Sequence, residues 1–434
     1  MADRERMRRA LEHAARLLAD APSTRLALAH LAGVLPPGAD AELPPDLRRR
    51  LQAAASDGRV PMPADHVERQ LSEGWGRVDG VLDELDPEPV AVRPGGQVHR
   101  GVHEGAPVAV KVRRPGLASV VRGDLVLVEQ AGRMVAGAVP GIDVAGLLRE
   151  VRERVLDEFD LEHEASVQRS FARALRSSER FVVGRPVSEL SAETVLVTPW
   201  VEGTPLVALA GVTSPEVPGP GDGVTSPAVP GPGDRVTSPA VPGPGDRGRN
   251  QLPRLGAAHA LVAFHLGAGR FGTVHADPDP RDALLTPDGR LAILDFGSVA
   301  HVPADRVVLA TAVLDALARR DGAGLAGALD ALGWLPGATA DDGTILLRLA
   351  EAVLGPFLDG PALLDPDAVG DLVERAGQAG PEAAALAQRT RVQPQDLWPL
   401  RGLAQLALAL APLGVEADWL ALSREALAQG WEGA

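Results

Sequence analysis

The chain of 434 residues contains no cysteine and no tyrosine. Without thiols it has no cysteine nucleophile, thiolate zinc site, redox pair or disulfide framework. Long apolar runs are missing as well. The longest, 403–413, contains a glutamine and a proline, and it is shorter than the roughly 18 residues of a membrane-spanning helix. Residues 1–21 are charged and lack a continuous apolar core, so the sequence predicts no secretory signal there.

The composition is typical of a folded globular protein. Apolar residues make up 45% of the chain and charged residues 23%, which is sufficient for a buried core. At roughly 150 residues per domain, the length allows two or three domains. The net charge of -15 argues against nucleic acid as a partner, because proteins that bind phosphate backbones usually carry a basic surface. We therefore expect no nucleic-acid partner. Because the sequence predicts neither a secretory signal nor a membrane-spanning helix, we expect a cytoplasmic protein.

Lysine is almost absent. Lys111 is the single lysine among 43 basic residues, and Asn250 is the single asparagine. Arginine has therefore replaced lysine wherever a positive charge alone was sufficient. A compact ammonium and a planar guanidinium are not interchangeable, so Lys111 is a candidate for a position that arginine cannot fill. The alternative is that one lysine survived by chance, and only its context can decide between the two.

Hydrophobic periodicity predicts a mixed chain. An amphipathic helix is expected over 3–20, with weaker helical patterns to about residue 75. Two β-prone runs, 97–102 and 106–112, are joined by 103–105 and predict a hairpin. The remaining predicted elements are helices over 118–137, 143–177 and 251–269, a second pair of strands at 181–187 and 194–201, and a helical subdomain from about 304 onwards.

Residues 211–246 contain three near-perfect copies of a unit rich in proline and glycine, such as GVTSPAVPGPGD. Valine is its only large hydrophobic residue, so the unit cannot build a core. We interpret the segment as an extended, mobile insertion between two folded halves. A docking site for proline-binding partners is the less favoured alternative.

Carboxylates bracket a short predicted hairpin near the middle of the chain. The apolar runs 283–286 and 291–294 flank the turn formers Pro-Asp-Gly. Asp282 precedes the hairpin and Asp295 follows it, so the two carboxylates can converge on one point. Hard oxygen ligands favour magnesium or manganese. Exposed loop aspartates are the ordinary alternative, but Asp295 opens a DFG sequence directly after an apolar strand, which favours a site.

The order of these parts is that of a protein-kinase-like fold. The amino-acid sequences of these parts resemble those of the UbiB/AarF atypical kinase-like family in particular. The matching segments are GGQVHRG (95–101), PVAVKVRRPG (107–116), EFDLEHEA (158–165), TVLVTPWVEG (194–203) and HADPDPRD (275–282). The resemblance implies an α+β, two-lobe fold with a small mixed N-lobe containing a β-sheet and a mainly helical C-lobe, preceded by an N-terminal helical extension. We expect the parts at 1–80 (extension), 81–205 (N-lobe), 206–250 (linker insertion) and 251–434 (C-lobe).

The resemblance also implies roles for single residues, with ATP and Mg2+ as cofactors. Lys111 would pair with the phosphates of ATP, Glu164 would hold its ammonium, and Asp277 would be the catalytic base. The other implied roles are metal ligation by Asp282 and Asp295, nucleotide contacts by Gly96 and Gln97, adenine contacts at a hinge by Pro199 and Val201, and regulation by Glu158 and Asp160.

Several positions depart from the family's pattern. Asp282 replaces an asparagine ligand and adds negative charge. Asp279 and Arg281 replace a histidine and a glycine. Residues 91–94, Ala-Val-Arg-Pro, are stiffer and larger than the family's small nucleotide loop, and no KxGQ sequence lies upstream. These departures place phosphoryl transfer in more doubt than nucleotide binding.

Two functions from different classes therefore compete. The first is an ATP-dependent atypical kinase or ATPase, which in this family supports isoprenoid-quinone or lipid pathways, with an unknown small-molecule or lipid substrate. The second is a pseudokinase-like scaffold that binds nucleotide without phosphoryl transfer. A small-molecule phosphotransferase is disfavoured by the segments at 95–101 and 158–165. The apolar face of the helix at 3–20 could pack against the protein core, which is the commoner case, or contact a membrane surface.

Overall fold

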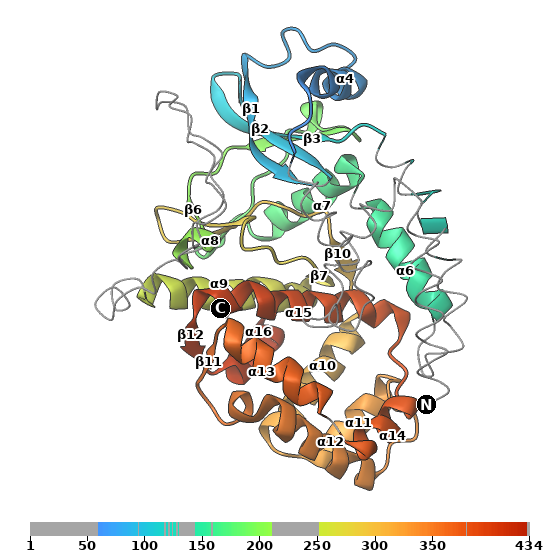
Figure 1. Ribbon diagram of the computed structural model, residues 1–434. Coiled ribbons are helices and arrows are strands. Elements are labelled where there is room, and N and C mark those ends of the chain that lie inside the picture. Colours follow the sequence, from blue (N-terminus) through green and yellow to red (C-terminus); the bar gives the residue numbers. More distant parts are fainter. Residues whose placement is uncertain are drawn as a thin grey trace, which may run out of the picture.

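A computed structural model describes residues 60–431, apart from 94, 158, 211–250, 379 and most of 117–143. The predicted helix at 3–20, the repeats at 211–246 and Glu158 lie outside the described residues. The described part has two lobes, a small one built around a β-sheet and a larger one made mainly of helices (Figure 1). This confirms the predicted α+β two-lobe fold. Nothing in the fold tests the predicted boundaries between the four parts, which remain predictions.

The small lobe contains a four-stranded antiparallel sheet in the order β1-β2-β3-β5. Its strands are β1 (Glu84–Arg93), β2 (Gly96–His103), β3 (Ala106–Arg113) and β5 (Val195–Pro199). The predicted hairpin is confirmed as β2 and β3. Glu104 and Gly105 form its turn with φ angles of 51° and 76°, the left-handed conformation that a two-residue hairpin turn requires.

One face of this sheet is covered by α4 (Ala64–Trp75). Side chains alternate along β3, so Val110 and Val112 point into this layer and are fully buried against Leu71 of α4. Each buried valine contributes about 1.5 kcal/mol or more to folding. The same alternation directs Lys111 to the opposite face, toward the second lobe.

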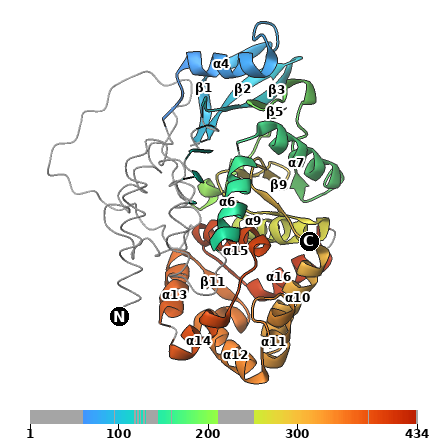
Figure 2. The ribbon, with the colours of Figure 1, turned by 90° about the vertical axis from the view of Figure 1, so that its right-hand side faces the viewer.

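Below the sheet lie α6 (Val144–Asp157) and α7 (Leu161–Ala174), as Figure 2 shows. Asp160 starts α7: its carboxylate accepts hydrogen bonds from the backbone N–H groups of Glu162 and His163. Such a cap stabilises a helix by about 1 kcal/mol. Leu161 packs with Leu196 of β5, so the first turn of α7 is fixed against the sheet. This places Glu164 beneath Lys111.

The strands predicted at 181–187 and 194–201 are present but shorter, as 181–182 and 195–199, and they belong to different sheets. β4 (Phe181–Val182) pairs in parallel with β9 (Leu291–Ile293), in a sheet of order β4-β9-β8-β6. The other members are β8 (Ala283–Leu285) and β6 (Thr204–Pro205). Both segments are apolar and β-prone, and their sequences carry no signal for the partner strand. The predicted hairpin around the Pro-Asp-Gly turn is confirmed as β8 and β9.

The larger lobe is helical, as predicted. Its helices are α8 (Leu206–Leu209), α9 (Gln251–Gly267), α10 (Ala304–Ala318), α11 (Gly322–Ala331), α12 (Ala340–Leu354), α13 (Pro366–Gly377), α14 (Pro381–Arg389), α15 (Leu397–Leu410) and α16 (Trp419–Gln429). Two small antiparallel pairs accompany them, β7 (Thr273–His275) with β10 (Val299–His301), and β11 (Ala362–Leu364) with β12 (Val415–Ala417). Within the described residues, no helix is long and apolar enough to cross a bilayer.

Aromatic rings join the two lobes at the centre of the core. Phe171 of α7 contacts Phe264 of α9 and Phe296 of the DFG sequence, with ring centroids 5.9 and 5.0 Å apart. All three side chains are almost completely buried. Aromatic contacts of this kind contribute about 0.5–1.5 kcal/mol beyond the buried area. The position of the DFG backbone is therefore fixed by the core on which it packs.

The two ends of the predicted insertion are close together. Arg254, in the first turn of α9, donates a hydrogen bond of 2.6 Å from Nε to the carbonyl oxygen of Leu209, the last residue of α8. Leu209 and Arg254, which flank the residues outside the description, are therefore in direct contact.

Candidate functional site

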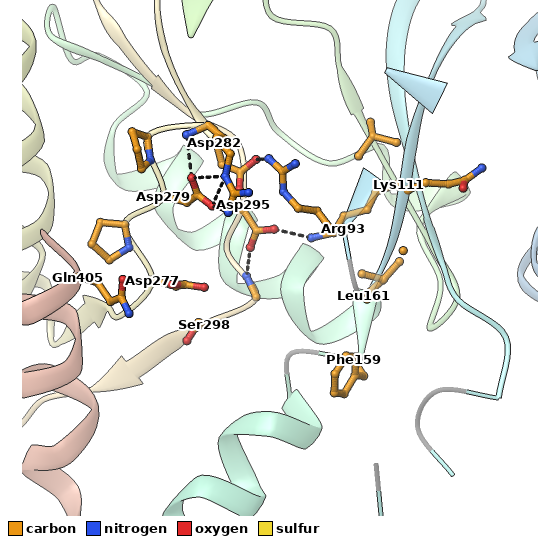
Figure 3. A pocket seen from close by; sticks show the side chains of 18 of the residues that line it. Arg93, Lys111, Phe159, Leu161, Asp277, Asp279, Asp282, Asp295, Ser298 and Gln405 are labelled. Atoms are coloured by element: carbon orange, nitrogen blue, oxygen red, sulfur yellow. Dashed lines mark hydrogen bonds and ion pairs between the residues drawn. The ribbon is translucent and has the colours of Figure 1, made fainter. Parts of the chain in front are cut away.

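Lys111 lies at the centre of an ion-pair cluster made by three separate elements. Its Nζ is 2.8 Å from both carboxylate oxygens of Glu164 on α7 and 2.7 Å from Oδ2 of Asp295 after β9. Glu164 is almost completely buried, whereas the Asp295 side chain is 38% exposed. Figure 3 shows Lys111 reaching from its strand toward Asp295. The structure thus brings together three of the predicted site residues.

Burial and charge shift the pKa values of all three groups. Burial favours the neutral amine of Lys111, but the Asp295 and Glu164 carboxylates outweigh it and hold its pKa above the ordinary value. Burial, with the charge of Asp295, raises the pKa of Glu164 to about 7. Burial also acts on Asp295, yet Lys111 and the N–H of Gly297 overcome it and lower its pKa to about 2. Asp295 is therefore ionised at neutral pH and available as a hard anionic ligand.

The backbone around Asp295 is held on both sides. The N–H of Gly297 donates to its Oδ1 at 2.9 Å, and Nε2 of His275 donates to its carbonyl oxygen at 2.7 Å. The N–H of Phe296 donates to Glu164 at 3.3 Å. The carboxylate of Asp295 is thus oriented by the Gly297 N–H and by Lys111, and its backbone is held by His275.

Asp282 meets a cation from the opposite lobe. Its Oδ1 lies 2.7 Å from Nη2 of Arg93, the last residue of β1. The Leu294 N–H also donates to the Asp282 carbonyl oxygen at 2.9 Å, which ties the start of the hairpin to its end and brings Asp282 beside Asp295, as predicted. Burial raises the pKa of Asp282 to about 6; Arg93 opposes this shift, and the charges of Asp295 and Asp279 add to it.

Replacing Asp282 by asparagine should change the pH dependence of stability. A carboxyl group whose pKa is raised on folding stabilises the protein below its unfolded value, near pH 4, and this contribution is lost as the pH rises through 6. The advantage of Asp282→Asn over wild type should therefore grow between pH 4 and 7.5, by up to about 3 kcal/mol. Urea unfolding at both pH values measures it. Glu164 titrates in both proteins, so its contribution cancels in the difference between their free energies of unfolding. If that difference did not vary with pH, the prediction would be contradicted.

Asp277 is positioned by a buried arginine. Nη2 of Arg401, on α15, lies 3.2 Å from Oδ1 of Asp277, and its Nη1 donates to the Ala276 carbonyl oxygen at 2.8 Å and to Ser298 Oγ at 3.2 Å. Arg401 is 7% exposed and its guanidinium lies over the ring of Trp398. The Asp277 carboxylate itself is 46% exposed and can reach a substrate.

These groups surround one cavity of about 500 Å³ between the lobes. Its upper wall is formed by β2, β3 and the end of β1, and its lower wall by the loop 277–282, the DFG sequence and α15. The site residues that line it are Gly96, Gln97, Lys111, Asp277, Asp282 and Asp295, together with Arg93, Asp279, Arg281 and Arg401. A volume of this size accommodates a small-molecule ligand.

Some predicted site residues lie elsewhere. The Gln97 side chain points into the layer under α4, where its Oε1 accepts from Met62 N–H at 2.6 Å, so only its backbone can reach a ligand. Pro199 and Val201 do not line the cavity. Asp160 caps α7 and does not line the cavity. Residues 91–93 form the end of β1, paired with β2, although the sequence predicted a loop.

The donor set fits a magnesium ion that phosphates help to bind. In the described part of the chain, no group of three or more histidine, aspartate or glutamate side chains could hold a metal by itself. Asp282 and Asp295 nevertheless present carboxylate oxygens on neighbouring backbone segments. Magnesium typically takes one or two carboxylates and completes its shell with phosphates and water.

Sequence reasoning missed two arginines, Arg93 and Arg401. A signal for Arg93 was present, because the sequence has an arginine where the family has a loop of small residues, and Asp282 stands where the family has a neutral ligand. The two changes compensate each other in charge. Nothing in the sequence pointed to Arg401, which lies more than a hundred residues beyond the loop it holds.

Comparisons with known proteins agree with this architecture. A family model described as the ABC1 atypical kinase-like domain matches residues 55–328. An Arabidopsis thaliana chloroplastic protein named Activity of bc1 complex kinase 3 is 28% identical over 55% of this chain and 29% of its own length. A probable protein kinase UbiB of Aeromonas hydrophila is 32% identical over 39% of this chain and 32% of its own length. The chain thus spans about a third of each of these two relatives.

A solved structure shares the fold. The Rv3197–erythromycin complex of Mycobacterium tuberculosis has a TM-score of 0.61 and 22% identity, and the match covers 94% of this chain and 92% of that one. The family model covers more than half of the residues, and relatives of the UbiB and ABC1 type agree with it. The protein therefore belongs to the ABC1 atypical kinase-like family.

Proposed function

We propose that the protein binds Mg·ATP in the cavity between the lobes and transfers or hydrolyses its terminal phosphate. The observation that carries this proposal is the cluster of Lys111, Glu164 and Asp295, assembled at the cavity from β3, α7 and the DFG sequence. A buried glutamate that holds a lysine beside an exposed aspartate is the arrangement that phosphate binding requires in kinase-like sites.

Each group then has a definite task. Lys111 donates to phosphate oxygens from a position fixed by Glu164. Asp295 and Asp282 hold the magnesium ion, which when bound neutralises charge on the phosphates. Asp277 accepts the proton of the attacking hydroxyl or water, and Arg401 keeps its carboxylate directed at the cavity.

The acceptor is proposed to be a small molecule or lipid, in line with isoprenoid-quinone metabolism. Support comes from relatives named UbiB and from the solved structure of similar fold, which holds erythromycin. We place the protein in the cytoplasm, with peripheral membrane contact as an extension of the same idea. The net charge of -15 supports the absence of a nucleic-acid partner.

A scaffold without phosphoryl transfer is the second candidate, and one observation favours it. Arg93 and Lys111 already neutralise Asp282 and Asp295, the two carboxylates that magnesium would need. Nucleotide binding could then alter the contact between the lobes without chemistry following.

Magnesium-dependent release of ADP, with and without quinol-like phenols or lipid, tests the proposal. We expect turnover in wild type and its loss in Asp295→Asn, because the amide keeps the shape of the side chain but is a weaker ligand for magnesium. Exposed Asp288, in the turn between β8 and β9, provides a matched control in Asp288→Asn, which should retain full turnover. Nucleotide binding without turnover under any condition would reject phosphoryl transfer and establish the scaffold.

A further inference from the structure

The carboxylates around the cavity are all paired with cationic side chains. The pairs are Lys111 with Glu164 and Asp295, Arg93 with Asp282, Arg281 with Asp279, and Arg401 with Asp277. A nucleotide brings several further negative charges to this cavity and needs hydrogen-bond donors there. At least one cation must therefore exchange a carboxylate for a phosphate.

The three cations other than Arg93 have less to offer in the ligand-free structure. The three donors of Lys111 face Glu164 and Asp295, so Lys111 can give a phosphate only the donor that Asp295 releases when that carboxylate binds magnesium. Arg401 is 7% exposed and its two terminal amines are held by the loop backbone, Ser298 and Asp277; its Nε has no partner among the described residues, but this depth of burial keeps it from a ligand. Arg281 donates hydrogen bonds from Nε and Nη2 to Asp279 in the same loop.

Arg93 has unused donors. Its Nη2 binds Asp282, but its Nη1 meets only the carbonyl oxygen of Val92 at the long distance of 3.5 Å. Its buried Nε has no hydrogen-bond partner among the described residues. A buried donor without an acceptor is unfavourable and needs an explanation, such as a ligand that supplies the acceptor. The Arg93 side chain lines the cavity and is 29% exposed, so a ligand can reach it.

The backbone of Arg93 belongs to the sheet, so its side chain can change partners without a change in the strand. Arg93 is the last residue of β1 and pairs with Gly96, the first residue of β2. A Cβ atom at Gly96 would lie 2.2 Å from the Val112 carbonyl oxygen, which shows how closely the start of β2 packs on β3. The guanidinium is therefore presented to the cavity from a strand end that is paired within the sheet.

We propose that Arg93 is a phosphate-binding residue. In the nucleotide complex its guanidinium releases Asp282 to the metal ion and donates to oxygens of the phosphate chain. A planar guanidinium suits this role because its parallel N–H groups match two phosphate oxygens. This inference rests on the proposed nucleotide binding. It also accounts for the aspartate at position 282, which is the counterion of Arg93 when no nucleotide is bound.

Calorimetric titration of the full chain with Mg·AMPPNP and with adenosine tests the assignment. Arg93→Gln should weaken Mg·AMPPNP binding by about tenfold or more, because charge-assisted hydrogen bonds are lost, and should leave adenosine binding unchanged. Asp282→Asn is measured alone as the reference for a double variant, because it removes the carboxylate that Arg93 pairs with and leaves an amide oxygen in its place. Arg348→Gln, which breaks an exposed ion pair with Glu382 far from the cavity, is the matched control and should bind like wild type.

The double variant separates a phosphate contact from a simple charge effect. If Arg93→Gln weakens binding only because Asp282 loses its counterion, then adding Asp282→Asn should restore it. A double variant that binds Mg·AMPPNP more weakly than Asp282→Asn supports the phosphate contact, whereas a double variant that binds as tightly as Asp282→Asn overturns it. Equal or tighter binding by Arg93→Gln also overturns it, with the proposed function intact. If wild type binds no nucleotide at all, both the proposed function and this assignment fall together.

Discussion

Replacing Lys111 by arginine should abolish most of the thermal stabilisation that Mg·ATP gives to the wild-type protein. A ligand at a hundredfold excess over its Kd stabilises a fold by about 2.7 kcal/mol, which a melting experiment resolves easily. In the structure, the ammonium lies within 2.8 Å of both Glu164 oxygens and of Asp295. The planar guanidinium of an arginine is too large to replace the ammonium beside Glu164 and Asp295 and still reach a phosphate.

The unliganded Lys111→Arg protein is the internal control. Its charge still compensates Glu164 and Asp295, and arginine is used everywhere else in this chain, so its melting temperature should stay close to wild type. A full response of the arginine variant to Mg·ATP would mean that Lys111 survived by chance. If wild type does not respond either, then the nucleotide does not enter the cavity.

Asp277→Asn should reduce the turnover number by about a hundredfold to ten-thousandfold while the affinity for Mg·AMPPNP stays unchanged. The amide cannot accept the proton, but its oxygen can still face Arg401, so the loop should keep its position. Steady-state ADP release gives the first quantity and calorimetry gives the second. Asp288→Asn, in the nearby turn, controls for the loss of one negative charge.

Other results would assign Asp277 differently. Loss of binding together with turnover would make it a structural residue that orders the loop. Full turnover would place the base elsewhere or leave the water to be activated by the metal alone. Asp277→Asn is thus also a test between the enzyme and the scaffold, because a scaffold has no turnover to lose.

The sequence predicted those parts of the site that sit on strong local patterns. Lys111 lies in an alternating apolar strand, and Asp295 follows a short apolar run that closes a hairpin. These patterns predicted the two elements, whereas the pairing of Lys111 with Glu164 was expected from the resemblance to the kinase-like family. The hairpin of β8 and β9 was predictable for the same reason, because its turn residues are specific.

Local sequence patterns could not predict contacts between residues that are far apart along the chain. Arg93 and Asp282 are 189 residues apart, and only charge compensation links them. Gln97 sits on a predicted strand, but the face it occupies depends on the register with β3, where it opposes Val112. A register shift of one residue would have directed the Gln97 side chain to the cavity instead. β4 and β5 belong to different sheets, and the sequence could not predict this because short apolar strands do not specify their partner strands.

The contact between Arg254 and Leu209 has an evolutionary consequence. Tandem copies of a short DNA unit are gained and lost readily during replication, and each such event would add or remove twelve residues between α8 and α9. Because the two helices hold the exit and the return of the chain together, a copy-number change leaves every described contact in place. Even a doubling of the loop costs only about 0.6 kcal/mol. Related strains can therefore differ in the number of repeats without any selection against the fold.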